Sequence, residues 1–173
     1  MRSGFCFWPY LLFLTACRSP SLTFPIPEQR TLPPRIDPPP IGSFLDFGQE
    51  DGLDYIVRDI DAGGEARWTR DHPELKFRVD TKAPVRLVLD FIVVEETFRT
   101  TGPLTLQVKV NDHPLESMRC ARPGEYHFEQ SVPPDWITHD GPTRVIAEAA
   151  PVWVAPADGA HLAYLLLRAG FRW

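Results

Sequence analysis

The sequence has few cysteines and no long apolar run. Only three cysteines occur in 173 residues, which excludes the dense disulfide framework of small secreted scaffolds. The uncharged stretch between Arg2 and Arg18 falls short of the ~20 residues that a membrane-spanning helix needs. No long Lys/Arg cluster is present and the formal net charge is −5. We therefore expect neither a transmembrane helix nor a nucleic-acid partner.

Common motifs of catalysis and metal binding are also missing. There is no G-x-S-x-G nucleophile motif, no glycine-rich phosphate loop and no H-E-x-x-H pair among the five histidines. The run from Asp59 begins like an EF-hand loop, but Gly63 and Arg70 stand where oxygen ligands are required. Glu95 and Glu96 are expected on opposite faces at a strand end, so they cannot converge on one glycosidic bond. We expect no metal, no cofactor and no enzyme.

The amino-terminal residues are organised like a bacterial export signal. Arg2 and the free amine form a short positive region, and an apolar run from Phe5 to Leu14 follows it. The next two residues, Thr15 and Ala16, are small, which suits a peptidase that must approach an extended backbone. A cysteine, the nucleophile that could accept a lipid, comes directly after them.

The stretch from Leu14 to Cys17 resembles the lipobox of bacterial lipoproteins at all four positions. In that family the cysteine thiol receives a diacylglycerol and the signal is removed. The resemblance implies a signal peptide over 1–16 and stable anchoring of Cys17 by two or three acyl chains such as palmitate. Arg18, where an aspartate would retain Gram-negative members at the inner membrane, implies the outer membrane, facing periplasm or surface. The alternative is an ordinary secretory signal with a coincidental cysteine.

Residues 17–41 are expected to form a tether. Its many prolines fix φ and remove backbone donors, so neither a helix nor an interior strand can extend through it. When extended, the segment could reach roughly 75 Å from the lipid. Alternatively, the proline run over 38–40 is a ligand for a partner's aromatic groove. The remaining residues, 42–173, are expected to form one domain.

Within this domain apolar residues recur at every second position, which predicts strands with one buried face. The clearest strands are 75–80 and 104–110. The run over 85–94 predicts a central strand covered on both sides. Residues 161–169 are expected to be a strand that stops at Gly170, with a short buried helix as the alternative. Weaker strands are expected at 53–60, 66–69, 125–128, 143–149 and 152–154. About eight or nine short strands separated by turns predict an all-β, antiparallel β-sandwich, and a jelly roll fits best.

Four stretches in the second half of the domain follow a recognisable order: 108–112, 124–128, 132–133 and 141–147. They resemble galactose-binding-like jelly rolls, in which a strand ending in Val-Asn-Gly precedes a strand of alternating aromatics and one that opens after a glycine. Asp112 occupies the position of that first glycine. Such modules often accompany carbohydrate-active enzymes and bind sugars through loops at one end of the sandwich. The resemblance therefore implies a jelly-roll fold and a carbohydrate ligand.

Aromatic residues with polar neighbours are the candidate ligand contacts. Sugars present C–H faces that stack on aromatic rings, and Trp153 lies next to a polar turn that contains Asp158. Trp68 also has neighbours whose side chains could bind hydroxyls: Arg67, Asp71 and His72. The alternative for each tryptophan is packing in the core or at the rim of the sandwich.

Two other groups leave alternatives open. Cys120 has Arg119 and Arg122 beside it, which could lower the pKa of its thiol and make it reactive. Alternatively it is a partly buried residue of a strand or loop, and we predict no internal disulfide. The acidic stretch over 50–54 is either a solvated turn or part of a calcium site built from distant loops.

Two classes of function fit the sequence. The first is a membrane-anchored lipoprotein that displays a non-catalytic β-sandwich module for glycan or cell-envelope polymer. The second is a structural or assembly subunit of an envelope protein complex, with an edge strand or apolar loops at the contact. A glycan-active enzyme is the remaining alternative.

The lipobox resemblance predicts the chemical state of Cys17. Mass spectrometry of the protein purified from cells is expected to show acyl groups on that sulfur and no residue before it. In that family the signal is removed after lipidation, and this cleavage makes the cysteine the new amino terminus. An intact leader, or an unmodified thiol, would contradict the lipoprotein interpretation.

Overall fold

The computed structural model describes residues 40–173. The predicted signal peptide over 1–16, the lipidation of Cys17 and nearly all of the tether over 17–41 therefore lie outside the described residues. Within residues 40–173, no helix combines the length and apolar character that crossing a membrane requires.

The described part of the chain contains twelve strands, one α-helix and two short 3-10 helices. The strands are β1 (Phe44–Asp46), β2 (Ile56–Ile60), β3 (Arg67–Phe77), β4 (Val85–Val93), β5 (Leu104–Val110), β6 (His113–Pro114), β7 (Met118–Cys120), β8 (Gly124–Val132), β9 (Thr143–Ala150), β10 (Trp153–Val154), β11 (His161–Leu162) and β12 (Leu165–Arg172). The helices are η1 (Leu53–Tyr55), α1 (Glu95–Thr101) and η2 (Pro134–Trp136).

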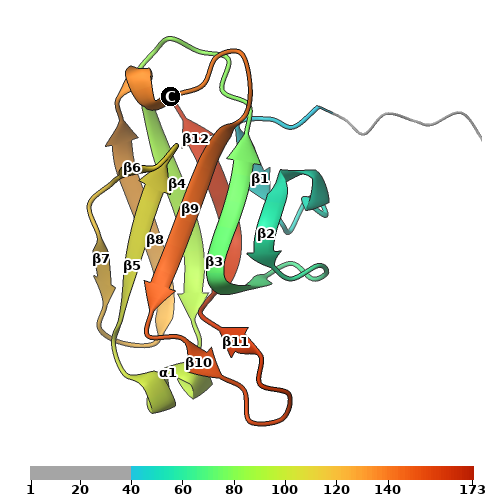
Figure 1. The fold of residues 1–173 in the computed structure, drawn as a ribbon, viewed down its shortest axis with the longest axis vertical. Helices are drawn as coiled ribbons and strands as arrows, with labels where there is room; N and C mark the ends of the chain where they lie inside the picture. The colour runs from blue at the N-terminus through green and yellow to red at the C-terminus, as the bar shows by residue number, and fades with distance from the viewer. Residues whose placement is uncertain (1–39) are drawn as a thin grey trace, which may run out of the picture. The chain divides into compact units, whose positions relative to one another are not determined.

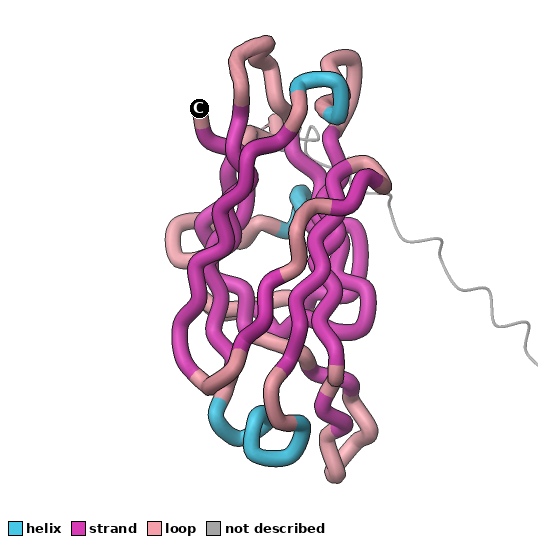
Figure 2. Tube along the Cα trace, turned by 90° about the vertical axis from the view of Figure 1, so that its left-hand side faces the viewer, coloured by secondary structure: helices cyan, strands magenta, loops and turns pink. Residues whose placement is uncertain are grey.

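The long strands form two antiparallel sheets that pack face to face (Figures 1 and 2). One sheet has the order β1-β12-β4-β8. The other has the order β2-β3-β9-β5, and the short β6 and β7 also pair with β5. The chain crosses between the sheets at most of its long connections, as in a jelly roll. The predicted antiparallel β-sandwich is confirmed.

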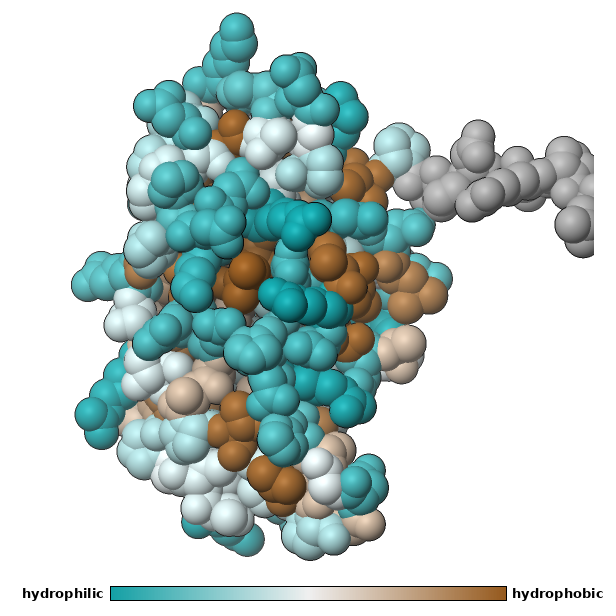
Figure 3. Space-filling view, in the orientation of Figure 1, coloured by the Kyte–Doolittle hydropathy of each residue, from teal (hydrophilic) through white to brown (hydrophobic). Residues whose placement is uncertain are grey.

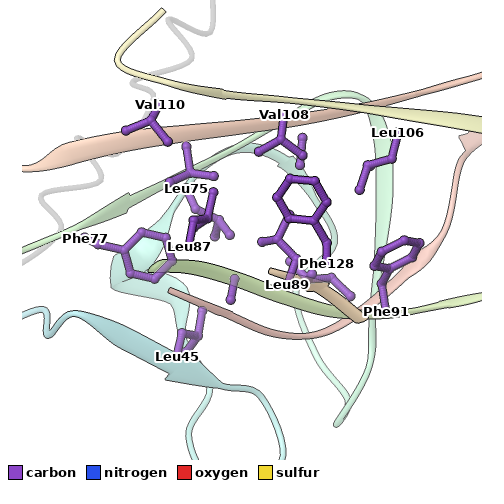
Figure 4. Packing of buried hydrophobic residues seen from close by; sticks show 14 of the residues in the cluster. Leu45, Leu75, Phe77, Leu87, Leu89, Phe91, Leu106, Val108, Val110 and Phe128 are labelled. Atoms are coloured by element: carbon purple, nitrogen blue, oxygen red, sulfur yellow. The ribbon is translucent and has the colours of Figure 1, made fainter. Parts of the chain in front are cut away.

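The hydrophobic core fills the space between the two sheets. On β5 the residues that face inward are Leu104, Leu106, Val108 and Val110. Figure 4 shows Val108 and Val110 opposite Leu87 and Leu89 of β4, with the ring of Phe128 between the sheets. Burying each such side chain contributes roughly 1.5–3 kcal/mol. The period-two alternation in the sequence therefore arises because each strand has one face in this layer.

Tyr164 is a polar residue in this core. It is 1% exposed, and its hydroxyl donates a hydrogen bond of 2.7 Å to the carbonyl of Ala147. Burial raises the pKa of Tyr164 far above its ordinary range. Because the hydroxyl has a partner, the ring is buried without leaving an unpaired donor.

The structure differs from the sequence prediction at several strands. The strand predicted over 53–60 starts with η1, and only 56–60 is extended. The segment Glu95 to Gly102, expected as a strand end and a loop, forms α1. The strands predicted at 66–69 and 75–80 belong to one long strand, β3. The single strand β3 therefore replaces two predicted strands.

The strand predicted over 161–169 differs more. It is split into β11 and β12, and β12 continues through Gly170 instead of stopping there. Gly170 has φ 145°, and a Cβ at this position would meet the carbonyl oxygen of Ser43 and lie 2.5 Å from the Cα of Phe44. This glycine therefore allows β1 to pack closely against β12, and it does not end the strand.

Cys120 is fully buried at the end of β7. Burial raises the pKa of its thiol to about 11. A thiol with this pKa is almost entirely protonated at neutral pH, so the structure favours the packing role over the reactive one.

Replacing Gly170 with alanine is expected to destabilise the protein by about 2 kcal/mol or more, because the new methyl group collides with backbone atoms of β1. Chemical denaturation of the purified protein measures this loss. Gly124→Ala is the matched control, since Gly124 also has a positive φ, of 129°, but nothing lies within 4 Å of its Cβ position. Equal losses in the two variants would show that the close approach of β1 is unimportant.

Candidate functional site

The candidate site begins with a distortion in β3. Arg58 of β2 pairs with Glu74, and Ile60 pairs with Thr69, so the four residues of β3 over 70–73 face the single residue Asp59. Asp59 has φ 57°, a left-handed conformation that aspartate adopts more readily than most residues. Bulges of this kind turn side chains away from the regular alternation of a strand.

Both ends of the distorted segment are held firmly. At one end Thr69 is fully buried, and its amide and hydroxyl both donate to the carbonyl of Tyr164 at 2.9 Å. At the other end the buried carboxylate of Glu74 accepts from Arg58 of β2 and Arg144 of β9, each at 2.9 Å. The intervening residues are therefore fixed in place even though they lack regular strand pairing.

An open depression of about 390 Å³ lies on the outer face of this sheet. Its lining comes from β2, the distorted part of β3, β5, β9 and the residues after β9: Asp59, Asp71, His72, Gln107, Glu148, Ala149, Ala150 and Val152. The volume is near the lower end of the range of roughly 300–1,000 Å³ for ligand pockets. Figure 3 shows this face, where hydrophilic side chains cover most of the sheet and apolar groups gather toward the side of β2.

His72 and Glu148 form the central pair of the depression. Nδ1 of His72 lies 2.7 Å from Oε1 of Glu148, and Nζ of Lys109 lies 3.5 Å from Oε2. The hydrogen bond to His72, together with the positive charge of Lys109, lowers the pKa of Glu148. The backbone amide of His72 also donates to Oδ2 of Asp59 at 3.2 Å.

A second imidazole and carboxylate pair links the distorted segment to β11. Nδ1 of His161 lies 2.9 and 3.0 Å from the two carboxylate oxygens of Asp71. In the neutral imidazole a proton on Nδ1 leaves Nε2 as an acceptor. Among the residues that the structure describes, neither Nε2 of His72 nor that of His161 has a hydrogen-bond partner. Both ring nitrogens are therefore free for a ligand or water.

Arg70 balances part of the negative charge nearby. Its Nε donates to Oδ1 of Asp61 at 2.8 Å, and this hydrogen bond raises the pKa of Arg70. The negative charges of Asp61, Asp59 and Asp158 raise it further. The guanidinium therefore stays charged and lies among three carboxylates beside the depression.

Two of the residues predicted to contact ligand, Asp71 and His72, lie together in the depression. Asp158 is in the loop between β10 and β11, where its Oδ1 accepts from the amide of Ala160 at 3.0 Å. Trp153 is half-buried on β10, directly after Val152, but does not itself line the depression. Trp68 is also half-buried and pairs with Leu165 of β12.

Arg67 lies away from the depression and is only 3% exposed. Its Nη2 donates to the carbonyl of Asp51 at 2.5 Å, and its guanidinium lies over the ring of Phe47, 4.9 Å from the centroid. Nε and Nη1 have no partner within residues 40–173. The side chain therefore anchors the turn before η1, and it is not beside Trp68 at the surface.

The sequence interpretation missed four residues of the site: Asp59, Gln107, Glu148 and His161. A signal existed for two of them, because the alternation on β5 and β9 turns Gln107 and Glu148 outward. That alternation does not say which outward side chains meet. Gln107 and Glu148 are opposite each other only because of the register between β5 and β9.

The acidic stretch over 50–54 lies elsewhere. It lines a separate depression of about 350 Å³ with Pro40 and Tyr55. In the part of the chain that the structure describes, no group of three or more His, Cys, Asp or Glu side chains is arranged to hold a metal ion.

No family model matches the sequence, and no curated protein matches it either. Solved structures that are similar include an exo-β-1,3-galactanase from Phanerochaete chrysosporium with β-1,3-galactotriose, with TM-score 0.41 and 10% identity over 77% of this chain and 29% of that one. The chain thus spans less than a third of the galactanase.

A family 35 carbohydrate-binding module from Clostridium thermocellum is similar with TM-score 0.39 and 14% identity, over 74% of this chain and 98% of the module. Latent PorU from Porphyromonas gingivalis is similar with TM-score 0.39 and 12% identity, over 76% of this chain and 13% of that one. All these TM-scores are below 0.5, so none of the likenesses assigns a ligand to this chain.

Removing the imidazole of His72 is expected to raise the pKa of Glu148 toward its ordinary value, because the hydrogen bond from His72 contributes most to lowering it. A carboxylate with a lowered pKa stabilises the fold above its ordinary pKa, and this stabilisation disappears as the pH falls through the lowered value. His72→Ala should therefore lose less stability on acidification than the unaltered protein.

A titration of the Glu148 carboxyl carbon by NMR measures the change, with Lys109→Ala expected to give a smaller upward shift. An unchanged titration of Glu148 in His72→Ala would contradict the assignment of this pair.

Proposed function

We propose that this chain is a lipid-anchored envelope protein whose β-sandwich is a non-catalytic glycan-binding module, with the depression on β2, β3, β9 and β5 as its binding surface. One observation carries this proposal: four strands place uncommitted hydrogen-bonding groups around a single open depression. Such a surface suits a polymer, because a chain of sugars can enter and leave at its sides.

The uncommitted groups match the hydroxyls of a sugar. Oδ1 of Asp59 is an acceptor, Nε2 of His72 and of His161 are acceptors when neutral, and the Gln107 amide is both donor and acceptor. None of these atoms has a hydrogen-bond partner in the described part of the chain. A sugar hydroxyl donates one hydrogen bond and accepts others, so several hydroxyls could be satisfied at once.

The rim of the depression supplies apolar surface. Ala150 and Val152 line it, and Trp153 follows on β10. Sugars carry C–H faces beside their hydroxyls, and an aromatic ring next to polar groups suits such a ligand. Trp153 would therefore contribute apolar contact at the edge of the surface, while the polar side chains form hydrogen bonds with the hydroxyls.

Glu148 does not fit the role of a general acid. A glycosidase needs a general acid whose pKa is raised so that it holds a proton near neutral pH. In contrast, the pKa of Glu148 is lowered by His72 and Lys109. This carboxylate therefore accepts hydrogen bonds and is a poor general acid.

The proposed lipid anchor and the β-sandwich module follow each other along the chain, with the proline-rich stretch between them. The first strand, β1, begins at Phe44, just after the proline-rich stretch that follows Cys17 in the sequence. A lipid on Cys17 and an extended tether would present the module to polymers outside the bilayer.

A protein partner is the second candidate, and the edge strand β2 favours it. Leu53 and Val57 are 51% and 40% exposed on η1 and β2. Within residues 40–173, β2 pairs only with β3. A strand or loop of another protein commonly binds at an open sheet edge that carries apolar side chains.

The test of the glycan proposal is retention on a panel of polysaccharides. The unaltered protein should be retained, and His72→Ala should bind about tenfold more weakly, because one hydrogen-bonding group of the depression is lost. Trp153→Ala should also weaken binding. His139→Ala is the matched control, since His139 is exposed and outside the depression.

If the unaltered protein is not retained on any polysaccharide, the glycan proposal fails. A stable protein partner captured from membrane extracts, and lost on Val57→Lys, would then support the assembly role.

A further inference from the structure

We propose that His127, Asp90 and Glu129 form a pH-sensitive latch, in which the protonated imidazole holds the edge strand β8 against β4 and loosens it as the pH rises. This inference goes beyond the glycan-binding function, because the latch lies on the sheet that does not carry the depression. It follows from a row of alternating charges across four strands and from the weak support of β8 on its other side.

The row of charges crosses the outer face of the sheet at one level. Asp46 of β1 is opposite Arg168 of β12. Arg168 is opposite Asp90 of β4, and Asp90 is opposite His127 of β8. Arg168 lies 3.4 Å from the carboxylate of Asp46 and 3.9 Å from that of Asp90. Opposite charges that face each other across two strands stabilise their pairing. The alternation is complete only when His127 is protonated.

The imidazole of His127 lies between two carboxylates. Its Nδ1 is 2.6 Å from Oδ1 of Asp90, and its Nε2 is 3.4 Å from Oε2 of Glu129. A neutral imidazole can donate from only one ring nitrogen, whereas the protonated ring donates from both. The hydrogen bond to Asp90 raises the pKa of His127, burial opposes this less strongly, and Glu129 raises the pKa further. The protonated ring therefore joins a carboxylate of β4 to one of β8.

The charges around His127 leave an excess of acid when the ring is neutral. The carboxylates are Asp46, Asp90, Glu125 and Glu129, and the arginines are Arg86 and Arg168. Arg86 of β4 donates to Glu129 of β8 at 2.9 Å, so this link does not depend on the pH. Without a proton on His127, Asp90 keeps only the more distant Arg168. Negative charges on β4 and β8 then repel each other, which weakens the pairing.

Strand β8 depends on this link because it is an edge strand. Within residues 40–173 it pairs only with β4. On its other side, the side chain of Gln130 exchanges hydrogen bonds of 3.1 and 3.4 Å with the backbone of Glu116. Opening of β8 would expose the ring of Phe128, which is 1% exposed in the closed strand, and the hydrogen-bonding edge of β4. The latch therefore controls an edge at which a strand of another protein could add.

The direction of the pH effect follows from the raised pKa of His127. A histidine of this kind contributes stability that is fully present below its ordinary pKa and is lost as the pH rises through the raised value. The excess of carboxylates on this face acts in the same direction. Strand β8 is therefore held most tightly in mild acid.

Hydrogen exchange of the full-length protein, followed by mass spectrometry, measures the opening of β8. After correction for the intrinsic effect of pH on exchange, peptides covering Gly124–Val132 should be about threefold less protected at about pH 9 than at about pH 5. The change is modest because a partly exposed ion pair alters an equilibrium by less than about fivefold.

Two variants separate the charge of His127 from its packing. His127→Lys carries a permanent positive charge, so the protection of β8 should stay high at both pH values. His127→Gln carries no charge, so the protection should be low at both. His139→Gln is the matched control, because His139 is exposed and lies between η2 and β9. This control should keep the pH dependence of the unaltered protein.

Three outcomes would overturn the latch. They are a protection of β8 that stays constant or increases as the pH rises, a pH dependence in His127→Gln equal to that of the unaltered protein, and low protection in His127→Lys at both pH values. None of them bears on the glycan-binding proposal, since the depression lies on the other sheet and is tested by retention on polysaccharides.

Discussion

The strand β3 pairs with strands of both sheets, and the rest of the domain depends on this constraint. Its first residues pair with β12, whereas its last four residues pair with β9. The change of partner is fixed on one side by Thr69, bonded to Tyr164, and on the other by Glu74, held between two arginines. The segment between them cannot follow regular pairing, and the candidate site is built there.

The side chains of this segment replace the missing backbone pairing. Arg70 bonds to Asp61, Asp71 to His161 of β11, and His72 to Glu148 of β9. Each of these partly exposed pairs is worth only about 0–1 kcal/mol. Their main effect is therefore geometric: they orient two imidazoles so that Nδ1 is occupied and Nε2 is free, which prepares the surface without contributing much stability.

Much of the fold could be predicted from the sequence because strand periodicity is a local property. The alternation at 104–110 and 143–149 gave β5 and β9 almost to the residue. Contacts between distant segments could not be read in this way. Gly170 looks like a strand end, but its role is set by β1, more than a hundred residues earlier. The distortion of β3 likewise depends on which strands it joins, so only Asp71 and His72 of the site were found.

Stacking on a tryptophan and hydrogen bonding in the polar depression would make different contributions to ligand recognition. Stacking on a ring such as Trp153 tolerates many sugars, because most of them present a C–H face. A site built from directed hydrogen bonds rejects analogues that leave its polar groups unpaired. Gln107 comes from a strand in register with β9, and His72 comes from a segment of β3 that Thr69 and Glu74 hold at its two ends, so their positions are set by the fold. Selectivity among sugars should therefore come from the polar side chains of the depression, while Trp153 at its edge contributes affinity.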